Sequence, residues 1–214
     1  MQEPTDQTAE APGSAAPAAE AGTRKRPKPG ERRIQILQTL ASMLEQTSAE
    51  RVTTAALAAR LDVSEAALYR HFASKAQMFE GLIEFIETSV FGLINKIGDT
   101  EENGIRQVRS IAGMLLEFAE QNPGMTRVMI GDALVNEDER LQLRMNQFVD
   151  RIEMALRQAL KIAATQGDLP ENEASARAAM VMAFVMGRWH RYAKGGFQSK
   201  PTEGAAQQLV MLAP

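Results

Sequence analysis

The side chains best suited to chemistry in this sequence gather between residues 53 and 75. Hydroxyl, phenol, imidazole and cationic groups recur there within a segment that is otherwise mostly alanine and leucine. Such groups bind phosphate oxygens, and the arginine Arg70 could also donate two hydrogen bonds to the acceptors of one guanine. The pattern indicates a DNA-binding surface, and we expect it to comprise Thr53, Thr54, Ser64, Glu65, Ala66, Tyr69, Arg70, His71 and Lys75.

Two short helices are expected to position these residues. Thr53 and Ser64 are each suited to cap a helix N-terminus, and each has a valine before it and a leucine four residues later. Helices are therefore predicted over 54–60 and 65–72, joined by a turn at Asp62 that needs a left-handed backbone. The second helix would enter the major groove with its N-terminal residues leading. The alternative is an ordinary helical hairpin with polar residues on its surface.

Charge is distributed unevenly along the chain. The net charge is −3, yet residues 24–78 hold ten Lys/Arg and five Asp/Glu, so this segment is +5 and the remainder is −8. A local basic field of this kind attracts phosphate whatever the total charge. The run Arg24-Lys25-Arg26-Pro27-Lys28, followed by Arg32 and Arg33, would form a basic arm for a DNA groove or its phosphates. The alternative is a solvated charge run.

The remaining chemistry gives no sign of an enzyme or a cofactor site. The chain has no cysteine, and its two histidines, His71 and His190, are far apart in the sequence. Gly195-Gly196 lacks the strand-turn-helix setting of a phosphate loop. No apolar run is long enough to span a membrane, and no secretory signal is recognisable. We expect a cytoplasmic, nucleoid-associated protein without metal, cofactor or membrane contact.

Helical periodicity extends through the chain, so an all-α fold is predicted. We expect a disordered tail with the basic arm over 1–29, a helix-turn-helix DNA-binding domain over 30–76 and a helical dimerisation and partner-binding domain over 77–214. In the first helix the predicted buried face consists of Ile34, Leu37, Leu40, Ala41 and Leu44. Further helices are predicted over 75–98, 104–121, 126–135, 138–166, 172–194 and 203–212.

Two of the long helices carry stripes suited to a subunit interface. Small or apolar residues recur at steps of three and four, which lets helix backbones approach closely. The predicted dimer interface comprises Phe148, Ile152, Ala155, Ala179, Ala183 and Gly187. The alternative is that these stripes form the internal core of one bundle. A dimer would place two recognition helices in successive major grooves, so a palindromic double-stranded site is expected.

The helix-turn-helix resembles the DNA-binding domain of the TetR family. The resemblance rests on Thr54, Leu57, Ala58, Val63, Ser64, Leu68, Tyr69, Phe72 and Lys75. Asp62 stands where that family usually has glycine. The resemblance implies an all-α homodimer with a three-helix DNA-binding head and a larger C-terminal body.

A narrower resemblance, to the nucleoid-occlusion members of that family, runs from about residue 32 to 160. It rests on the strings over 63–72, 82–87, 122–124, 140–142 and 144–147. It implies binding to DNA and to the division protein FtsZ, which blocks septum formation over the chromosome. By resemblance, the FtsZ tail would dock between the fourth and fifth helices, on Phe85, Met114 and Asn122. Glu117 and Gln121 stand where the best-known of those members would have glycine and arginine.

The residues alone give Phe85 a second interpretation. It lies well away from the core stripe of its helix, with Met78 nearly above it, so the two could form an apolar spot that packs against a neighbouring helix. Two alternative functions also stay open. One is a TetR-type transcriptional repressor released by a small-molecule ligand, and the other is a helical interaction module whose DNA-binding head is vestigial.

Overall fold

The computed structural model describes residues 30–46 and 52–213, and within these ranges every regular element is a helix. The predicted all-α fold is therefore confirmed. The predicted tail over 1–29, with its basic arm Arg24–Lys28, lies outside the described residues. The bounds of the elements are α1 Glu31–Leu44, α2 Thr54–Arg60, α3 Glu65–Tyr69, α4 Lys75–Thr100, α5 Gly104–Gln121, α6 Pro123–Met129, η1 Asp132–Leu134, α7 Glu139–Gln166, η2 Glu171–Glu173, α8 Ala174–Lys194 and α9 Ala205–Leu212.

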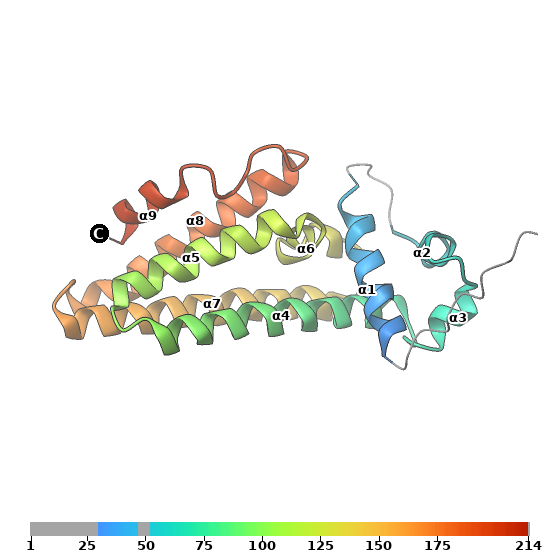
Figure 1. Cartoon of the computed structure of the whole chain (residues 1–214), viewed down its shortest axis with the longest axis horizontal. Coiled ribbons are helices and arrows are strands. Elements are labelled where there is room, and N and C mark those ends of the chain that lie inside the picture. Colours follow the sequence, from blue (N-terminus) through green and yellow to red (C-terminus); the bar gives the residue numbers. More distant parts are fainter. Residues whose placement is uncertain (1–29, 47–51, 214) are drawn as a thin grey trace, which may run out of the picture.

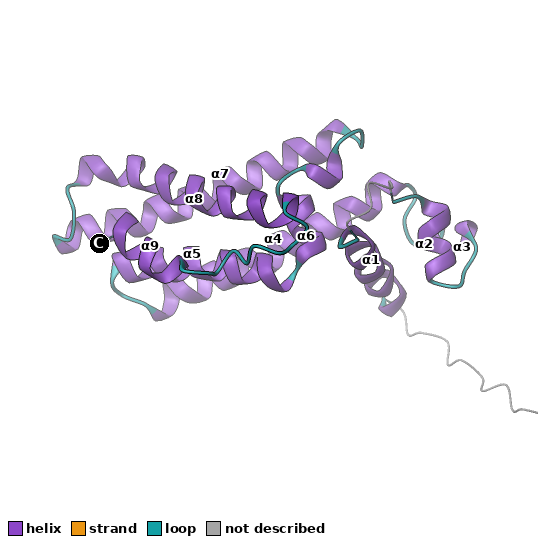
Figure 2. Ribbon diagram, turned by 90° about the horizontal axis from the view of Figure 1, so that it is seen from above, coloured by secondary structure: helices purple, strands orange, loops and turns teal. Residues whose placement is uncertain are grey.

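The helices form a small unit at one end of an elongated body (Figure 1). Helices α1, α2 and α3 make the small unit, which we call the head. The long helices α4, α5, α7 and α8 run lengthwise in the body, where α7 packs along both α5 and α8. Helix α4 begins beside the head and continues to the far end of the body, as the view from above also shows (Figure 2). Short α6 packs against α1, so it joins the body to the head.

The core of the body is filled by large side chains. Trp189 on α8 is completely buried, and its indole N–H donates a hydrogen bond of 3.1 Å to the carbonyl of Leu115 on α5. Phe148 on α7 is also completely buried, and its ring meets the edge of Phe91 on α4 with centroids 5.7 Å apart. Aromatic side chains of this size bury a large apolar area, which stabilises the bundle. The buried indole N–H also has a hydrogen-bond acceptor.

Three local expectations are wrong, each for a physical reason. Ile34 is 58% exposed and Ile36 is buried instead, because residues two apart lie on nearly opposite sides of a helix. Helix α4 passes through Gly98 to Thr100, since glycine lowers helix propensity without preventing the conformation. Helix α6 begins at Pro123, because proline fits the first helical position, where its missing N–H would have no partner.

Candidate nucleic-acid interface and partner surface

The caps and the turn of the helix-turn-helix have the predicted geometry. Thr53 Oγ1 accepts a hydrogen bond of 3.1 Å from the backbone N–H of Ala56 at the start of α2. Ser64 Oγ accepts one of 3.3 Å from the N–H of Ala67 at the start of α3. Between the helices, Asp62 has φ 55°, which is the left-handed conformation expected of the turn. Local capping and turn chemistry therefore specify this motif.

The head has a small core that holds α3 in place. Leu57, Leu68 and Phe72 are each 1% exposed, and the partly buried Val63 packs against them. Arg33 of α1 lies over this core, with its guanidinium carbon 4.1 Å from the centre of the Phe72 ring. Its Nη1 also donates a hydrogen bond to the carbonyl of His71. These contacts leave the outer surfaces of α2 and α3 open.

The predicted DNA-binding residues on α2 and α3 lie together on that open surface. Thr53, Ser64, Glu65, Ala66, Tyr69 and Arg70 are exposed, while Thr54 and His71 are half-buried. The Thr54 hydroxyl donates a hydrogen bond of 2.6 Å to Glu65 Oε2, so the starts of the two helices are joined. Both helix N-termini offer free N–H groups, which suit phosphate oxygens. Contact of these residues with DNA stays a prediction.

The structure does not bring Lys75, Arg32 and Arg33 into this set as expected. Lys75 Nζ is 2.5 Å from Glu137 Oε1, so its charge is paired with the body instead of being directed to phosphate. Contact of Lys75 with DNA stays a prediction. Arg33 ties α1 to the end of α3, and Arg32 Nη1 donates a 2.8 Å hydrogen bond to Gln35 on its own helix.

The predicted partner surface lies on α4 and α5. Phe85 is 52% exposed in the first half of α4, although it is a large aromatic residue. Met114 of α5 is half-buried, and Asn122 caps the end of α5 by donating from Nδ2 to the carbonyl of Phe118 at 2.8 Å. Met78 is buried, so the expected pairing of Met78 with Phe85 in one surface spot is wrong. Phe85 is therefore exposed on α4 without Met78 beside it on the surface.

The structure also places Glu117 and Gln121, the two residues singled out by the resemblance. Glu117 is exposed on α5 and lines an open groove of about 380 Å³ between α5 and α9, together with Gly113 and Arg109. Gln121, the last residue of α5, is exposed as well. Neither residue is needed for packing, so both are available to a partner.

The predicted dimer interface needs correction on α7. Phe148 and Ile152 are completely buried within one chain and have no surface left for a second subunit. Ala155 is half-buried beside them. Periodicity identified a true stripe on α7, but the stripe faces α5 and α8 of the same chain, which was the alternative interpretation.

Helix α8 does present a free stripe, in which Ala179, Ala183 and Gly187 are exposed. Three large apolar residues that sequence reasoning missed are exposed on this helix pair: Leu143 and Met154 on α7, at 55% and 61%, and Met180 on α8 at 56%. Their signal was available, since each lies on the otherwise polar or small-residue face of its helix. A surface that combines small residues with exposed methionines suits a subunit interface.

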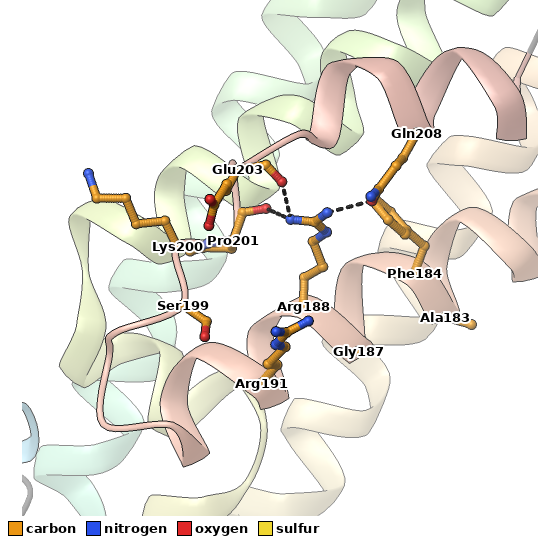
Figure 3. Close-up of a pocket in the computed structure, with 10 residues that line it drawn as sticks. All are labelled: Ala183, Phe184, Gly187, Arg188, Arg191, Ser199, Lys200, Pro201, Glu203 and Gln208. Atoms are coloured by element: carbon orange, nitrogen blue, oxygen red, sulfur yellow. Dashed lines mark hydrogen bonds between the residues drawn. The ribbon is translucent and has the colours of Figure 1, made fainter.

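Beside this stripe, α8 and the segment before α9 enclose an open groove of about 630 Å³ (Figure 3). Arg188 occupies its centre, where Nη1 donates to the carbonyls of Pro201 at 2.8 Å and Glu203 at 2.7 Å. Nη2 of the same guanidinium donates to Gln208 Oε1. Arg188 therefore fixes the C-terminal segment onto α8 next to Ala183.

Comparison with known proteins identifies the family. Residues 36–82 match "Bacterial regulatory proteins, tetR family", and residues 102–213 match "Tetracyclin repressor-like, C-terminal domain" of the SlmA-like type. The chain is 49% identical over 187 residues to the nucleoid occlusion factor SlmA of a Marinomonas species, a match that covers 87% of this chain and 95% of that protein. The chain belongs to the TetR family, and within it to the SlmA group. Members of this family are DNA-binding regulators rather than enzymes.

Further relatives agree with this placement. The SlmA of Photobacterium profundum is 51% identical over 180 residues, with 82% of this chain and 91% of that protein covered. Among solved structures, the TetR-family regulator PfmR of Thermus thermophilus superposes with a TM-score of 0.70 at 20% identity, covering 84% of this chain and 97% of that one. A TetR regulator of Haloarcula marismortui gives a TM-score of 0.72 at 14% identity, with 86% and 96% covered. The structural matches confirm the predicted TetR-like fold.

Two negative findings concern only the described residues, 30–46 and 52–213. None of their helices is long and apolar enough to cross a membrane. They also contain no group of three or more His, Asp or Glu residues arranged to hold a metal ion.

Proposed function

We propose that this protein is a dimeric, sequence-specific DNA-binding nucleoid-occlusion factor that binds FtsZ and blocks septum formation over the chromosome. The relatives named SlmA, which match most of the chain, support this function. The structural observation that carries the FtsZ part is the exposure of Phe85 on α4. The proposed function would place the protein in the cytoplasm, on the nucleoid.

The physical argument for the partner surface begins with Phe85. An aromatic side chain left half in water is unfavourable unless a partner covers it, and aromatic residues dominate the binding energy of many protein interfaces. Met114 is a flexible, half-buried apolar residue of α5, the helix that packs against α4, and Asn122 lies at the end of α5. We infer that a short segment of FtsZ docks along this face. Glu117 and Gln121 would then set a contact chemistry different from that of relatives with glycine and arginine.

The DNA-binding part rests on the head. We propose residues 30–76 as the DNA-binding domain, and residues 77–214 as the dimerisation and partner-binding domain. Thr53, Thr54, Ser64 and Tyr69 would bind phosphates, and Arg70 would contact base edges. Two heads related by a two-fold axis would read a palindromic site.

A repressor released by a small-molecule ligand is the second candidate, and the structure favours it less. Ligand sites in proteins are enclosed, mostly apolar cavities with a few convergent polar groups. Here the middle of the body is occupied by completely buried side chains, Trp189, Phe148 and Leu115 among them. The grooves beside α8 and α5 are open to solvent at the surface.

The FtsZ proposal is tested by titrating labelled, purified FtsZ with the wild-type protein and with Phe85→Ala. The wild type should bind, and Phe85→Ala should bind about thirtyfold more weakly, because truncation of an aromatic hot spot costs at least ~2 kcal/mol. Met211→Ala is the matched control, since Met211 is 79% exposed on α9. Equal affinity of Phe85→Ala and wild type would remove Phe85 from the partner surface. The absence of any wild-type binding would favour the repressor.

A further inference from the structure

The segment over residues 123–137, which comprises α6, η1 and the loop before α7, lies between the head and the body; we call it the bridge segment. At Gly124 the backbone of this segment packs directly against the backbone of α1. A Cβ atom added to Gly124 would lie 1.9 Å from the carbonyl oxygen of Ala41, so the two backbones are in direct contact. Any side chain at residue 124 would force α1 and α6 apart. The position of the head on the body is thus sensitive to single atoms here.

Arg127 of the bridge segment binds the free carbonyl groups at the end of α1. Its Nη1 is 3.3 Å from the carbonyl of Leu44 and 3.3 Å from that of Gln46. These carbonyls lie at a helix C-terminus, where a cation is favoured by the helix dipole. The same guanidinium also pairs with Asp132, because its Nε and Nη2 are each 2.9 Å from Asp132 Oδ2.

Asp132 continues the chain of contacts to α8. Its other oxygen, Oδ1, pairs with the ammonium of Lys194 in the last turn of α8. Burial raises the pKa of Asp132, but hydrogen bonds from Lys194 and Arg127 outweigh it, so its pKa is lowered and the carboxylate stays charged. A second brace runs in parallel, because Glu137 of the bridge segment pairs with Lys75 at the start of α4.

We propose that Arg127 and Asp132 are positioning residues for DNA binding, which set the distance between the two heads of the dimer. The contacts form a path from Lys194 on α8 through Asp132 and Arg127 to the end of α1. Helix α8 also carries the exposed stripe proposed as the subunit interface. With the subunit interface on α8, the path would connect that interface to each head. This inference rests on the proposed dimeric DNA binding and adds the residues that fix its geometry.

The physical consequence concerns half-site spacing rather than base preference. A dimer binds two half-sites only if its recognition helices match their separation along the DNA. A rigid path from α8 to α1 confines the heads to one separation, so a duplex with altered spacing must be deformed or loses half of its contacts. Loosening the path leaves each head able to read its half-site, but removes the penalty for incorrect spacing.

The test measures spacing discrimination. A palindromic operator is first selected from random duplexes with the wild-type full-length protein. Affinity is then measured for this operator and for versions with one base pair inserted or deleted at its centre. We expect the wild type to prefer the native spacing, and we expect Arg127→Ala and Asp132→Asn to reduce the ratio of affinities at least about fivefold. The dependence of binding on salt should not change, because no phosphate contact is lost.

Glu101→Gln provides the control, since Glu101 forms an ion pair of 3.0 Å with Arg106 at the far end of the body. It should keep the wild-type ratio. Gly124→Ala supplies an independent variant that retains every charge but displaces α1, so its preferred spacing should shift. An unchanged ratio in a folded, dimeric Arg127→Ala or Asp132→Asn protein would overturn the proposal, as would an equal effect of Glu101→Gln. If the wild type selects no operator, the proposed DNA binding is contradicted. That result differs from an unchanged affinity ratio, which contradicts only the role of Arg127 and Asp132.

Discussion

Single residues at the turn between α2 and α3 decide whether the recognition helix is presented. Asp62 adopts a left-handed backbone with φ 55°, a conformation that glycine adopts more easily. Aspartate tolerates this conformation better than most residues, because its short polar side chain can bond locally. The strain is small and confined to one residue. The free-energy cost of this strain can be measured, because the helix on each side of the turn begins at a capping residue.

The cost of that backbone conformation can be separated from the side-chain contacts of Asp62. Both Asp62→Ala and Asp62→Gly remove the side chain, so the difference between them reports only the left-handed backbone. We expect Asp62→Ala to have a free energy of unfolding about 1 kcal/mol lower than Asp62→Gly. Urea denaturation followed by circular dichroism measures both. Equal stabilities would show that the turn changes conformation in the variants.

We propose that direct base reading depends on one residue, Arg70. Arg70 is exposed at the end of α3, and we expect Arg70→Ala to cost about 1–3 kcal/mol on the preferred operator and to relax the preference at one base pair per half-site. Tyr69→Ala is the comparison, since a phosphate contact should weaken binding to all sequences alike. Binding measured over a set of single-base variants distinguishes the two. A uniform loss for Arg70→Ala would reassign it to phosphate contact.

The residue-level predictions that are confirmed concern local chemistry, while partners distant in the sequence were not predicted. Thr53 and Ser64 each accept a hydrogen bond from a backbone N–H three residues away, and Asp62 forms the turn itself, so these roles are readable from the sequence. Lys75 pairs with Glu137, and Arg33 bonds the carbonyl of His71, across 62 and 38 residues respectively. No sequence periodicity encodes such partners, because they are determined by how α1 and the bridge segment pack.

At the scale of elements, the helices follow from periodicity and capping, while their neighbours do not. The buried stripe of α4 was predictable, and Ile83, Ile86 and Val90 are completely buried. The stripe of α7 was also real, yet it faces the interior of its own chain, so Phe148 is a core residue. A stripe shows which residues share a face, and only the packed structure shows what covers that face.

The exposed stripe of α8 leads to a prediction about assembly. Ala183→Glu adds a charge at its centre without lowering helix propensity much. Burying that charge between two subunits would be costly, so we expect the variant to be monomeric and to bind the palindromic operator far more weakly. Analytical ultracentrifugation measures the mass. Gln207→Glu, which adds the same charge on exposed α9, should remain dimeric. A dimeric Ala183→Glu protein would place the interface elsewhere.

The whole molecule combines a basic segment with an acidic body. Residues 24–78 are +5 and the rest of the chain is −8, so the positive charge is concentrated in one segment of the sequence. The body adds ion pairs that hold its helices to one another, and Arg144 donates to both carboxylate oxygens of Glu87 across α7 and α4. The hydrogen bonds with Glu87 raise the pKa of Arg144 above its ordinary value. This ion pair therefore stabilises the packing of α7 against α4.

Under the proposed function, one dimer would hold an operator and FtsZ together. The proposed DNA-binding residues lie on or beside α2 and α3, whereas Phe85 lies on α4. The two surfaces do not overlap in one chain, so DNA should not compete with FtsZ. Concentration of the protein on chromosomal sites would then confine inhibition of division to the nucleoid.

The most direct measurement is FtsZ polymer assembly, followed by light scattering, with the protein bound to its selected operator or mixed with a scrambled duplex of equal length. The proposed function predicts that the operator complex suppresses assembly strongly. The scrambled mixture should act more weakly, and the Phe85→Ala operator complex should have no effect. Normal polymer assembly in the presence of the wild-type operator complex would contradict the proposed function.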